Sequence, residues 1–125
     1  MILMIGVGSN SPDKQQRMVD ALAFLRESLK EFRCSSVYST PALNGVDADY
    51  LNAVACGSCE LTQEQAVAML KDYERQCGRT KGDECVVIDL DLVMADGDVL
   101  RPRDMEREYF MRGYRELTGA CGQVQ

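Results

Sequence analysis

Two aspartates placed one residue apart are the best candidates for chemistry in this 125-residue chain. Asp89 and Asp91 lie inside the largely apolar segment 86–94. Side chains alternate along a strand, so both carboxylates point to one face while Leu90 points to the other. Two buried like charges need a nearby cation, and carboxylate oxygens suit Mg²⁺, which usually completes its coordination with water and substrate phosphates. The pair therefore predicts phosphoryl chemistry. The alternative is a half-exposed edge strand with two solvated aspartates.

The composition argues against several other kinds of site. The chain has no histidine, so a catalytic histidine is excluded. Cys56 and Cys59 form a CxxC pair, but a second pair is missing and the sequence does not indicate zinc. The net charge of -6 argues against a nucleic-acid partner, which would require a basic surface.

The sequence also predicts where the protein resides. No apolar run is long enough to cross a bilayer, and the apolar segment 1–8 has neither a basic leader nor a cleavage pattern. We therefore expect a cytoplasmic protein with no membrane partner. Its six cysteines are then expected to be reduced thiols.

The periodicity of the apolar residues predicts the elements that position the aspartates. Residues 1–8 predict a buried strand, and Ser11 and Pro12 are typical of the first positions of a helix. Residues 34–39 predict a second strand, and the small and turn-forming residues of segment 40–49 predict a loop. The first helix is expected to bury a stripe at helical spacing, formed by Met18, Leu22, Leu25, Leu29 and Phe32.

A second helix follows a third strand, residues 50–60. Thr62 and Gln65 form a capping box, and the helical pattern continues to about Cys77. A polar loop, residues 78–84, then leads into the aspartate strand. The residues expected on the inward face of this helix are Ala66, Met69, Leu70 and Tyr73.

After the aspartate strand, Asp96-Gly97 is typical of a hairpin turn, and residues 104–117 predict a last helix. The order is strand, helix, strand, strand, helix, strand. This order predicts an α+β, ferredoxin-like βαββαβ sandwich, in which helices pack on an antiparallel sheet. No linker or repeat interrupts the chain, so we expect a single domain over residues 1–125.

Five short motifs occur in a fixed order along the chain. They are Gly8-Ser9-Asn10, Ser39-Thr40-Pro41 with Leu43, Asp49-Tyr50-Leu51-Asn52-Ala53, Glu74 with Gly78-Arg79, and Asp89-Leu90-Asp91. A sixth and weaker match is Phe110-Met111. Over residues 4–111 this ordered set resembles the 6-hydroxymethyl-7,8-dihydropterin pyrophosphokinase family. These folate-pathway enzymes move a pyrophosphoryl group from ATP to the hydroxymethyl oxygen of the pterin.

The resemblance implies a role for each matching residue. Asp89 and Asp91 would be catalytic residues that hold two Mg²⁺ ions against the ATP phosphates, and Arg79 would neutralise phosphate charge as a further catalytic residue. The resemblance also implies that Glu74 and Arg79 face the nucleotide, and we predict Lys81 and Arg103 as further ATP-binding residues that are not part of the family's motifs. The implied pterin pocket consists of Thr40, Pro41, Leu43, Tyr50, Asn52 and Phe110. Without the resemblance, the expected roles would be core packing for Tyr50 and Phe110 and a solvated surface pair for Glu74 and Arg79.

The departures from the family's pattern fall on the ATP side. The family usually has Gly-Pro-Arg where this chain has Glu84-Cys85-Val86, and an arginine expected two residues before Phe110 is Glu108. The basic residues left to replace the lost charge are Lys81, Arg101, Arg103 and Arg107. Three interpretations stay open: an ATP-dependent pyrophosphokinase, a relative that binds pterin or metal-nucleotide without efficient turnover, and a ferredoxin-like interaction module with solvated aspartates.

Overall fold

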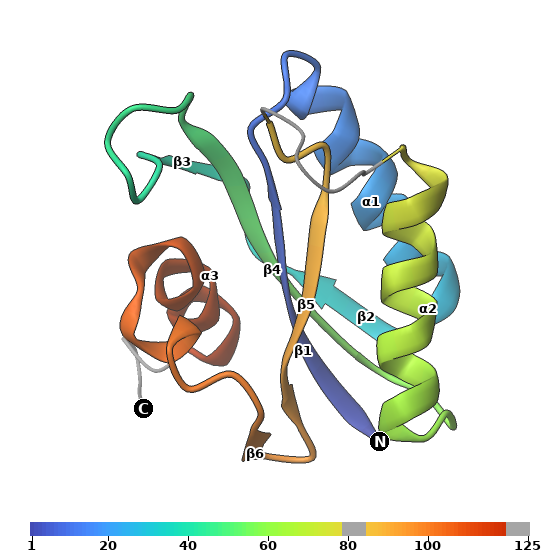
Figure 1. Ribbon diagram of the computed structural model, residues 1–125. Helices are drawn as coiled ribbons and strands as arrows, with labels where there is room; N and C mark the ends of the chain where they lie inside the picture. Colours follow the sequence, from blue (N-terminus) through green and yellow to red (C-terminus); the bar gives the residue numbers. More distant parts are fainter. Residues whose placement is uncertain (79–84, 120–125) are drawn as a thin grey trace.

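The computed structural model describes residues 1–78 and 85–119. These residues form an antiparallel six-stranded sheet (Figure 1). The strands lie in the order β2 (Lys30–Cys34), β4 (Tyr50–Ser58), β1 (Ile2–Ser9), β5 (Asp89–Ala95) and β6 (Asp98–Val99), and β3 (Tyr38–Thr40) also pairs with β4. This α+β arrangement confirms the predicted fold class and is compatible with a ferredoxin-like fold.

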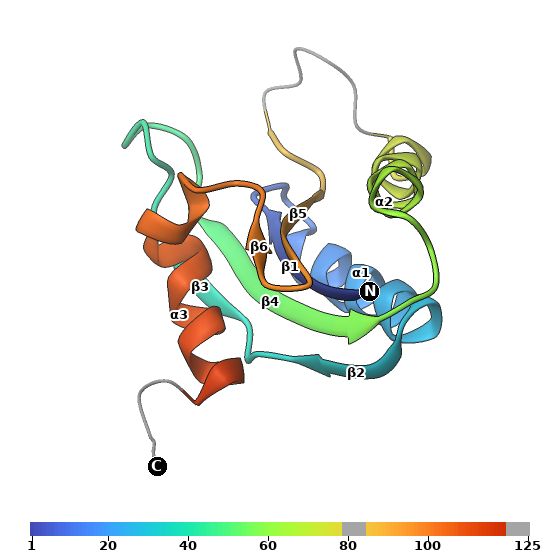
Figure 2. The same cartoon turned by 90° about the horizontal axis from the view of Figure 1, so that it is seen from below.

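Helices cover both faces of the sheet. α1 (Lys14–Ser28) and α2 (Gln63–Gln76) pack on one face, and α3 (Glu108–Thr118) packs on the other after the short 3-10 helix η1 (Asp104–Glu106) (Figure 2). No helix in the described part of the chain is both long and apolar enough to span a membrane.

The alternation predicted for the aspartate strand is confirmed. Ile88 and Leu90 are fully buried in the core beneath α1 and α2. Asp89 and Asp91 lie on the opposite face of β5, and Val93 on that face packs against α3. The strand therefore separates the main apolar core from a polar site, as its sequence period requires.

Two turn signals in the second half of the chain are also confirmed. At the start of α2, the Thr62 side chain accepts a hydrogen bond from the Gln65 N–H, and the Gln65 side chain accepts one from the Thr62 N–H. Asp96 and Gly97 have φ values of 50° and 86° and connect β5 to β6. Both residues adopt the left-handed conformation that a tight hairpin favours.

The predicted start of the first helix was wrong. The Ser11 hydroxyl donates to the Asp13 carboxylate instead of capping a helix, and the backbone N–H of Lys14 bonds the Ser11 carbonyl. Residues 11–13 thus form a turn, and α1 begins at Lys14. Phe32, expected on this helix, belongs to β2 because α1 ends at Ser28.

The single strand predicted over residues 34–39 is divided into β2 and β3. Ser35 lies at the division. Its hydroxyl oxygen accepts a hydrogen bond from the Val54 N–H at 2.9 Å, and its own N–H bonds the Val54 carbonyl at 2.8 Å. The Ser35 hydroxyl thereby replaces a backbone carbonyl as the acceptor in the hydrogen-bond ladder of the sheet. The strand is interrupted at Ser35 for this reason.

Candidate functional site

A cavity of about 370 Å³ opens on the face of the sheet that carries the two aspartates. Gly6 and Gly8 of β1 form its floor. Gly8 pairs with Asn52 on one side and with Asp89 on the other, while Gly6 pairs with Asp91. No side chain rises from β1 at these two positions, so the sheet has a notch between Asn52 and the aspartates.

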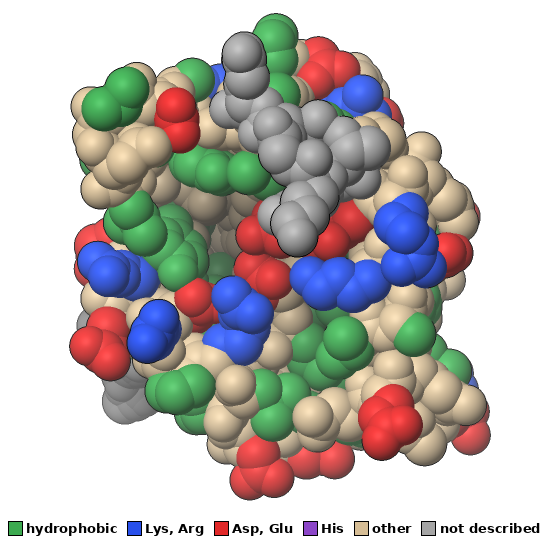
Figure 3. Space-filling view, viewed as in Figure 1, with side chains coloured by type: hydrophobic (Ala, Val, Ile, Leu, Met, Phe, Trp, Pro, Cys, Tyr) green, Lys and Arg blue, Asp and Glu red, His purple; other side chains and the backbone are tan. Residues whose placement is uncertain are grey.

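The predicted pterin-binding residues and both aspartates line this one cavity, together with other residues. The predicted ones are Thr40, Pro41, Leu43, Tyr50, Asn52, Asp89, Asp91 and Phe110. Asn52 is almost fully buried, and its side-chain amide donates to the Thr40 hydroxyl at 2.6 Å. In the space-filling view, apolar side chains border one side of the hollow and charged side chains the other (Figure 3). The roles of these residues stay predictions.

The two predicted aromatic residues differ in their surroundings. Phe110 is 1% exposed and packs with Val54 and Val93, so most of its ring belongs to the core beneath α3. Its edge reaches the floor, where a Cβ at Gly6 would lie 3.4 Å from Phe110 Cδ1. Tyr50 is partly exposed at the rim, where it is more accessible to a flat ligand.

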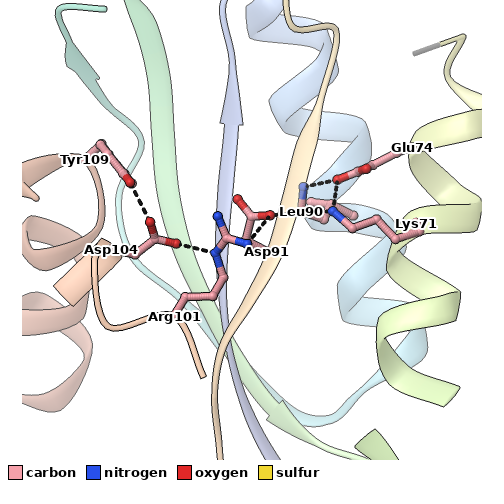
Figure 4. Close-up of polar contacts among 7 residues, drawn as sticks. All are labelled: Lys71, Glu74, Leu90, Asp91, Arg101, Asp104 and Tyr109. Atoms are coloured by element: carbon pink, nitrogen blue, oxygen red, sulfur yellow. Dashed lines mark hydrogen bonds and ion pairs between the residues drawn. The ribbon is translucent and has the colours of Figure 1, made fainter. Parts of the chain in front are cut away.

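Three residues that line the cavity, Arg101, Asp104 and Tyr109, form a polar network (Figure 4). Asp104 is 4% exposed, and its carboxylate accepts from Arg101 Nε at 2.7 Å and from the Tyr109 hydroxyl at 2.5 Å. These hydrogen bonds satisfy both oxygens of a buried carboxylate, which would otherwise be costly. The network fixes Arg101 beside the aspartates. The sequence pattern indicated Arg101 only as one of several cations and did not indicate Asp104 or Tyr109.

Glu74 is the third carboxylate of the site. It is 5% exposed, and its Oε2 accepts a hydrogen bond from the Leu90 N–H at 2.6 Å. β6 pairs only with the end of β5, so the Leu90 N–H points outward from an open sheet edge and Glu74 satisfies it. The interpretation of Glu74 as part of a solvated surface pair was wrong.

The three carboxylates could hold a metal ion. One oxygen from each of Glu74, Asp89 and Asp91 lies within 4.8 Å of the others. Hard oxygen donors of this kind suit Mg²⁺. The donor set thus fits the metal that the sequence predicts, and no histidine or thiol is required.

Two cations flank the carboxylates. Lys71 Nζ of α2 lies 3.4 Å from Glu74 Oε2 and 3.6 Å from Asp91 Oδ1, and Arg101 Nη1 lies 3.8 Å from the same Asp91 oxygen. Lys71 was not among the residues predicted from the sequence. Its spacing of three residues from Glu74 on a predicted helix would have placed the two on one face.

Burial is the main cause of an unusual pKa at Asp91. The pKa rises to about 7, first because the side chain is buried and next because of the charge and hydrogen bond of Asp89. Arg101 and Lys71 oppose this rise. Burial also raises the pKa of Tyr109, with the hydrogen bond to Asp104 as the second cause. The cations therefore neutralise the carboxylates only in part.

The Gly8-Ser9-Asn10 motif holds the segment that enters β5. The Ser9 hydroxyl donates to the Val87 carbonyl at 2.6 Å. The Asn10 side-chain oxygen accepts from the Val86 N–H at 2.6 Å, and the Asn10 N–H donates to the Val86 carbonyl at 3.0 Å. The predicted strand 86–94 consequently begins only at Asp89, because residues 86 and 87 bond this motif.

The structure does not bring every predicted residue into the cavity. Arg79 and Lys81 lie outside the described residues. Arg103 is exposed and does not line the cavity, whereas Arg101, two residues earlier, does. The described cation nearest to Asp91 after Lys71 is therefore Arg101, and an ATP-binding role for Arg103 stays a prediction.

A family model described as 7,8-dihydro-6-hydroxymethylpterin-pyrophosphokinase (HPPK) matches residues 4–119. No curated protein matches the sequence. The matched range contains every residue that lines the cavity and runs from β1 to the residue after α3.

Proposed function

The chain belongs to the 7,8-dihydro-6-hydroxymethylpterin-pyrophosphokinase family, and from this premise we propose that it transfers a pyrophosphoryl group from ATP to 6-hydroxymethyl-7,8-dihydropterin. The observation that supports this most directly is a single cavity that contains both an amide-and-aromatic pocket and a carboxylate cluster. The proposal places the reaction in folate biosynthesis and the protein in the cytoplasm.

The pterin would occupy the side of the cavity near β3 and β4. Asn52 offers a side-chain amide, whose orientation is fixed by its hydrogen bond to Thr40. Tyr50 at the rim and the edge of Phe110 at the floor offer aromatic surface to a flat ring. Pro41 and Leu43 extend this wall from the loop after β3. These contacts would direct the hydroxymethyl group toward Asp89 and Asp91.

Glu74, Asp89 and Asp91 would hold Mg²⁺ at the other side of the cavity. Bound Mg²⁺ polarises phosphoryl oxygens and offsets the charge that develops during transfer. The charges of the described residues support a bound metal, because Glu74, Asp89, Asp91 and Asp104 supply four carboxylates there against the two cations Lys71 and Arg101. A polyphosphate would be repelled unless divalent ions were bound.

The reaction needs no nucleophile from the protein. The pterin hydroxymethyl oxygen would lose its proton to solvent and form a bond to the β-phosphorus of ATP. The bond from that phosphorus to the bridging oxygen of the α-phosphate would break, and AMP would leave with that oxygen. The protein would orient the two substrates above the floor formed by Gly6 and Gly8. Positioning and electrostatics then account for most of the rate increase.

The proposal predicts AMP release that requires both Mg²⁺ and the pterin. Asp89→Asn and Asp91→Asn should each lower the rate of AMP release by about 100-fold or more, since each removes a charged metal ligand. Asn52→Ala should mainly raise the KM for pterin, by roughly 10- to 100-fold, through lost paired hydrogen bonds. Asp98→Asn is the matched control, because Asp98 is exposed on the neighbouring hairpin.

The alternative is a relative that binds its ligands without efficient turnover. Val86 favours this non-catalytic alternative, because the family that the chain resembles usually has an arginine at that position. Calorimetric titration separates the interpretations. Binding of both pterin and Mg²⁺-nucleotide without AMP release would support the non-catalytic relative, and failure to bind Mg²⁺ under any condition would favour an interaction module.

A further inference from the structure

Two side-chain cations approach one carboxylate oxygen from different parts of the fold (Figure 4). Lys71 Nζ extends from α2 to within 3.6 Å of Asp91 Oδ1, and Arg101 Nη1 extends from the segment after β6 to within 3.8 Å of it. Both distances exceed the range of a hydrogen bond. Each cation therefore lies beside Asp91 without committing its donors to that carboxylate.

The two cations are also accessible. About half of each side chain is exposed, 44% for Lys71 and 48% for Arg101, whereas the Asp91 side chain is only 17% exposed. Both cations are therefore open to a ligand from solvent, although Lys71 borders the carboxylates from α2 and is not among the residues that line the cavity. Arg101 lines the cavity directly.

The side chain of Arg101 is held in place by a hydrogen bond to Asp104, on the side of the guanidinium away from Asp91. Its Nε donates to the buried Asp104 carboxylate, whose other oxygen accepts from Tyr109. This leaves the outer nitrogen Nη1 of the guanidinium directed toward Asp91. A fixed guanidinium loses less side-chain entropy when it binds a phosphate than a mobile one would.

We infer that Lys71 and Arg101 form a two-sided clamp for the polyphosphate of the nucleotide, with Asp104 as the positioning residue for Arg101. The inference rests on the proposed function, since it presumes a polyphosphate substrate at the carboxylates. Without a ligand, the same two cations partly neutralise Asp91 and Glu74. When metal occupies the carboxylates, the ammonium and the guanidinium become available to phosphate oxygens.

Because Lys71 and Arg101 would have both roles, their removal is expected to change the affinity for Mg²⁺ and the affinity for polyphosphate in opposite directions. Lys71→Met and Arg101→Met each remove a positive charge beside the metal ligands, so Mg²⁺ alone should bind about threefold more tightly. The same variants should bind inorganic tripolyphosphate in saturating Mg²⁺ about tenfold more weakly, because each loses a charge-assisted contact. Both affinities are measured by isothermal titration calorimetry without pterin.

Two further variants define the geometry. Lys71→Arg should retain tripolyphosphate affinity within about threefold of the parent, because charge and reach are kept. Asp104→Asn should weaken tripolyphosphate binding by about threefold without tightening Mg²⁺ binding as the Arg101 variant does, because Arg101 keeps its charge but loses its ionic anchor. Arg75→Met is the control, since Arg75 is exposed on α2 and pairs with Asp72.

Each combination of measured affinities either supports the clamp or overturns it. Tighter Mg²⁺ binding with unchanged tripolyphosphate affinity would reduce both cations to counter-ions and overturn the clamp. Weaker binding of both Mg²⁺ and tripolyphosphate would give Lys71 and Arg101 a merely structural role and would also overturn the clamp. If the clamp effects are found but no AMP is released in the presence of pterin, the proposed reaction fails and the polyphosphate site stands. If AMP is released and both methionine variants bind tripolyphosphate like the parent, only the clamp fails.

Discussion

Asp91 is the residue at which burial and charge oppose each other in this site. Its side chain is 17% exposed, and burial followed by the charge of Asp89 raises its pKa to about 7. In the unfolded chain an aspartate titrates near pH 4. The folded state consequently binds the proton more tightly. Asp91 therefore contributes stability that is fully present below about pH 4 and is lost as the pH rises toward 7.

Replacing Asp91 with asparagine should make stability less sensitive to pH. In metal-free buffer at pH 8, Asp91→Asn is expected to raise the free energy of unfolding by roughly 1–3 kcal/mol, since the ionisation no longer has to occur in a buried site. At pH 4 the two proteins should agree within about 0.5 kcal/mol. Urea titrations at both pH values test this. Asp98→Asn should behave like the parent, and a pH-independent difference for Asp91→Asn would contradict the electrostatic explanation.

At the residue scale, the sequence predicted the site best where its residues are neighbours along the chain or belong to a motif. The alternation that sets Asp89 and Asp91 opposite Leu90 is a local property of a strand. Asp104 and Tyr109 could not be selected in this way, because their importance comes from a tertiary contact with Arg101. Charge alone does not distinguish Arg101 from Arg103. That distinction requires the path of the chain after β6.

At the scale of elements, one tyrosine connects α3 to the sheet through two hydrogen bonds. The Tyr38 hydroxyl of β3 donates to the Tyr109 carbonyl at 2.7 Å and accepts from the Gly113 N–H at 3.0 Å. An α-helix would pair that carbonyl and that N–H with each other. Burial raises the pKa of Tyr38 to about 12, so the hydroxyl stays protonated and can donate. The absence of a side chain at position 113 makes this approach possible.

Gly113→Ala tests whether close packing outweighs helix propensity. A Cβ at residue 113 would lie 2.7 Å from Val54 Cγ2 and 2.9 Å from the Tyr38 hydroxyl, both too short for an ordinary contact. Alanine favours a helix over glycine by about 1 kcal/mol, whereas overpacking a core typically costs about 1–3 kcal/mol and here also disturbs two hydrogen bonds. We expect a net loss of about 1–2 kcal/mol in the free energy of unfolding.

The measurement is chemical denaturation followed by circular dichroism, with Arg115→Ala as the control at a half-exposed position of α3. Arg115 pairs with Glu108, so its replacement should change the free energy of unfolding by no more than about 0.5 kcal/mol. A Gly113→Ala variant as stable as the parent would show that α3 can move away from the sheet at little cost. In that case Tyr38 would not fix its position.

The elements that the sequence located well carry explicit local signals. The capping box at Thr62 defines the start of α2, and Asp96-Gly97 defines the hairpin. The end of α1 has neither glycine nor proline, so the helical pattern was extended wrongly to Phe32. The break at Ser35 was not predictable from periodicity, because it depends on a hydroxyl that bonds a residue of another strand. Tertiary hydrogen bonds thus set the boundaries that local propensity leaves open.

At the scale of the whole molecule, the site joins both layers of the fold. Glu74 and Lys71 come from α2 on one side of the sheet, while Arg101, Asp104 and Tyr109 come from the η1–α3 side. The aspartates of β5 lie between them. A ligand bound to the carboxylates would therefore stabilise α2 and β5 together, and binding should be coupled to the global unfolding transition.

Mg²⁺ should accordingly raise the free energy of unfolding of the whole chain. At a free concentration 100 times its dissociation constant, the expected gain is about 2.7 kcal/mol for one site that the unfolded chain lacks. Glu74→Gln should lose at least about 1.4 kcal/mol of this gain, equivalent to a tenfold weaker affinity, because it removes one anionic ligand. The glutamine still offers an oxygen to the Leu90 N–H, so the sheet edge stays satisfied without metal.

Urea titrations with and without Mg²⁺ give this gain for each protein, and hydrogen exchange at the Leu90 amide shows whether β5 shares in it. Glu60→Gln is the matched control, because its side chain is 91% exposed and lies on the loop before α2. It should gain as much from Mg²⁺ as the parent. A full Mg²⁺ gain in Glu74→Gln would remove α2 from the metal site, and the two aspartates of β5 would then have to bind the ion without it.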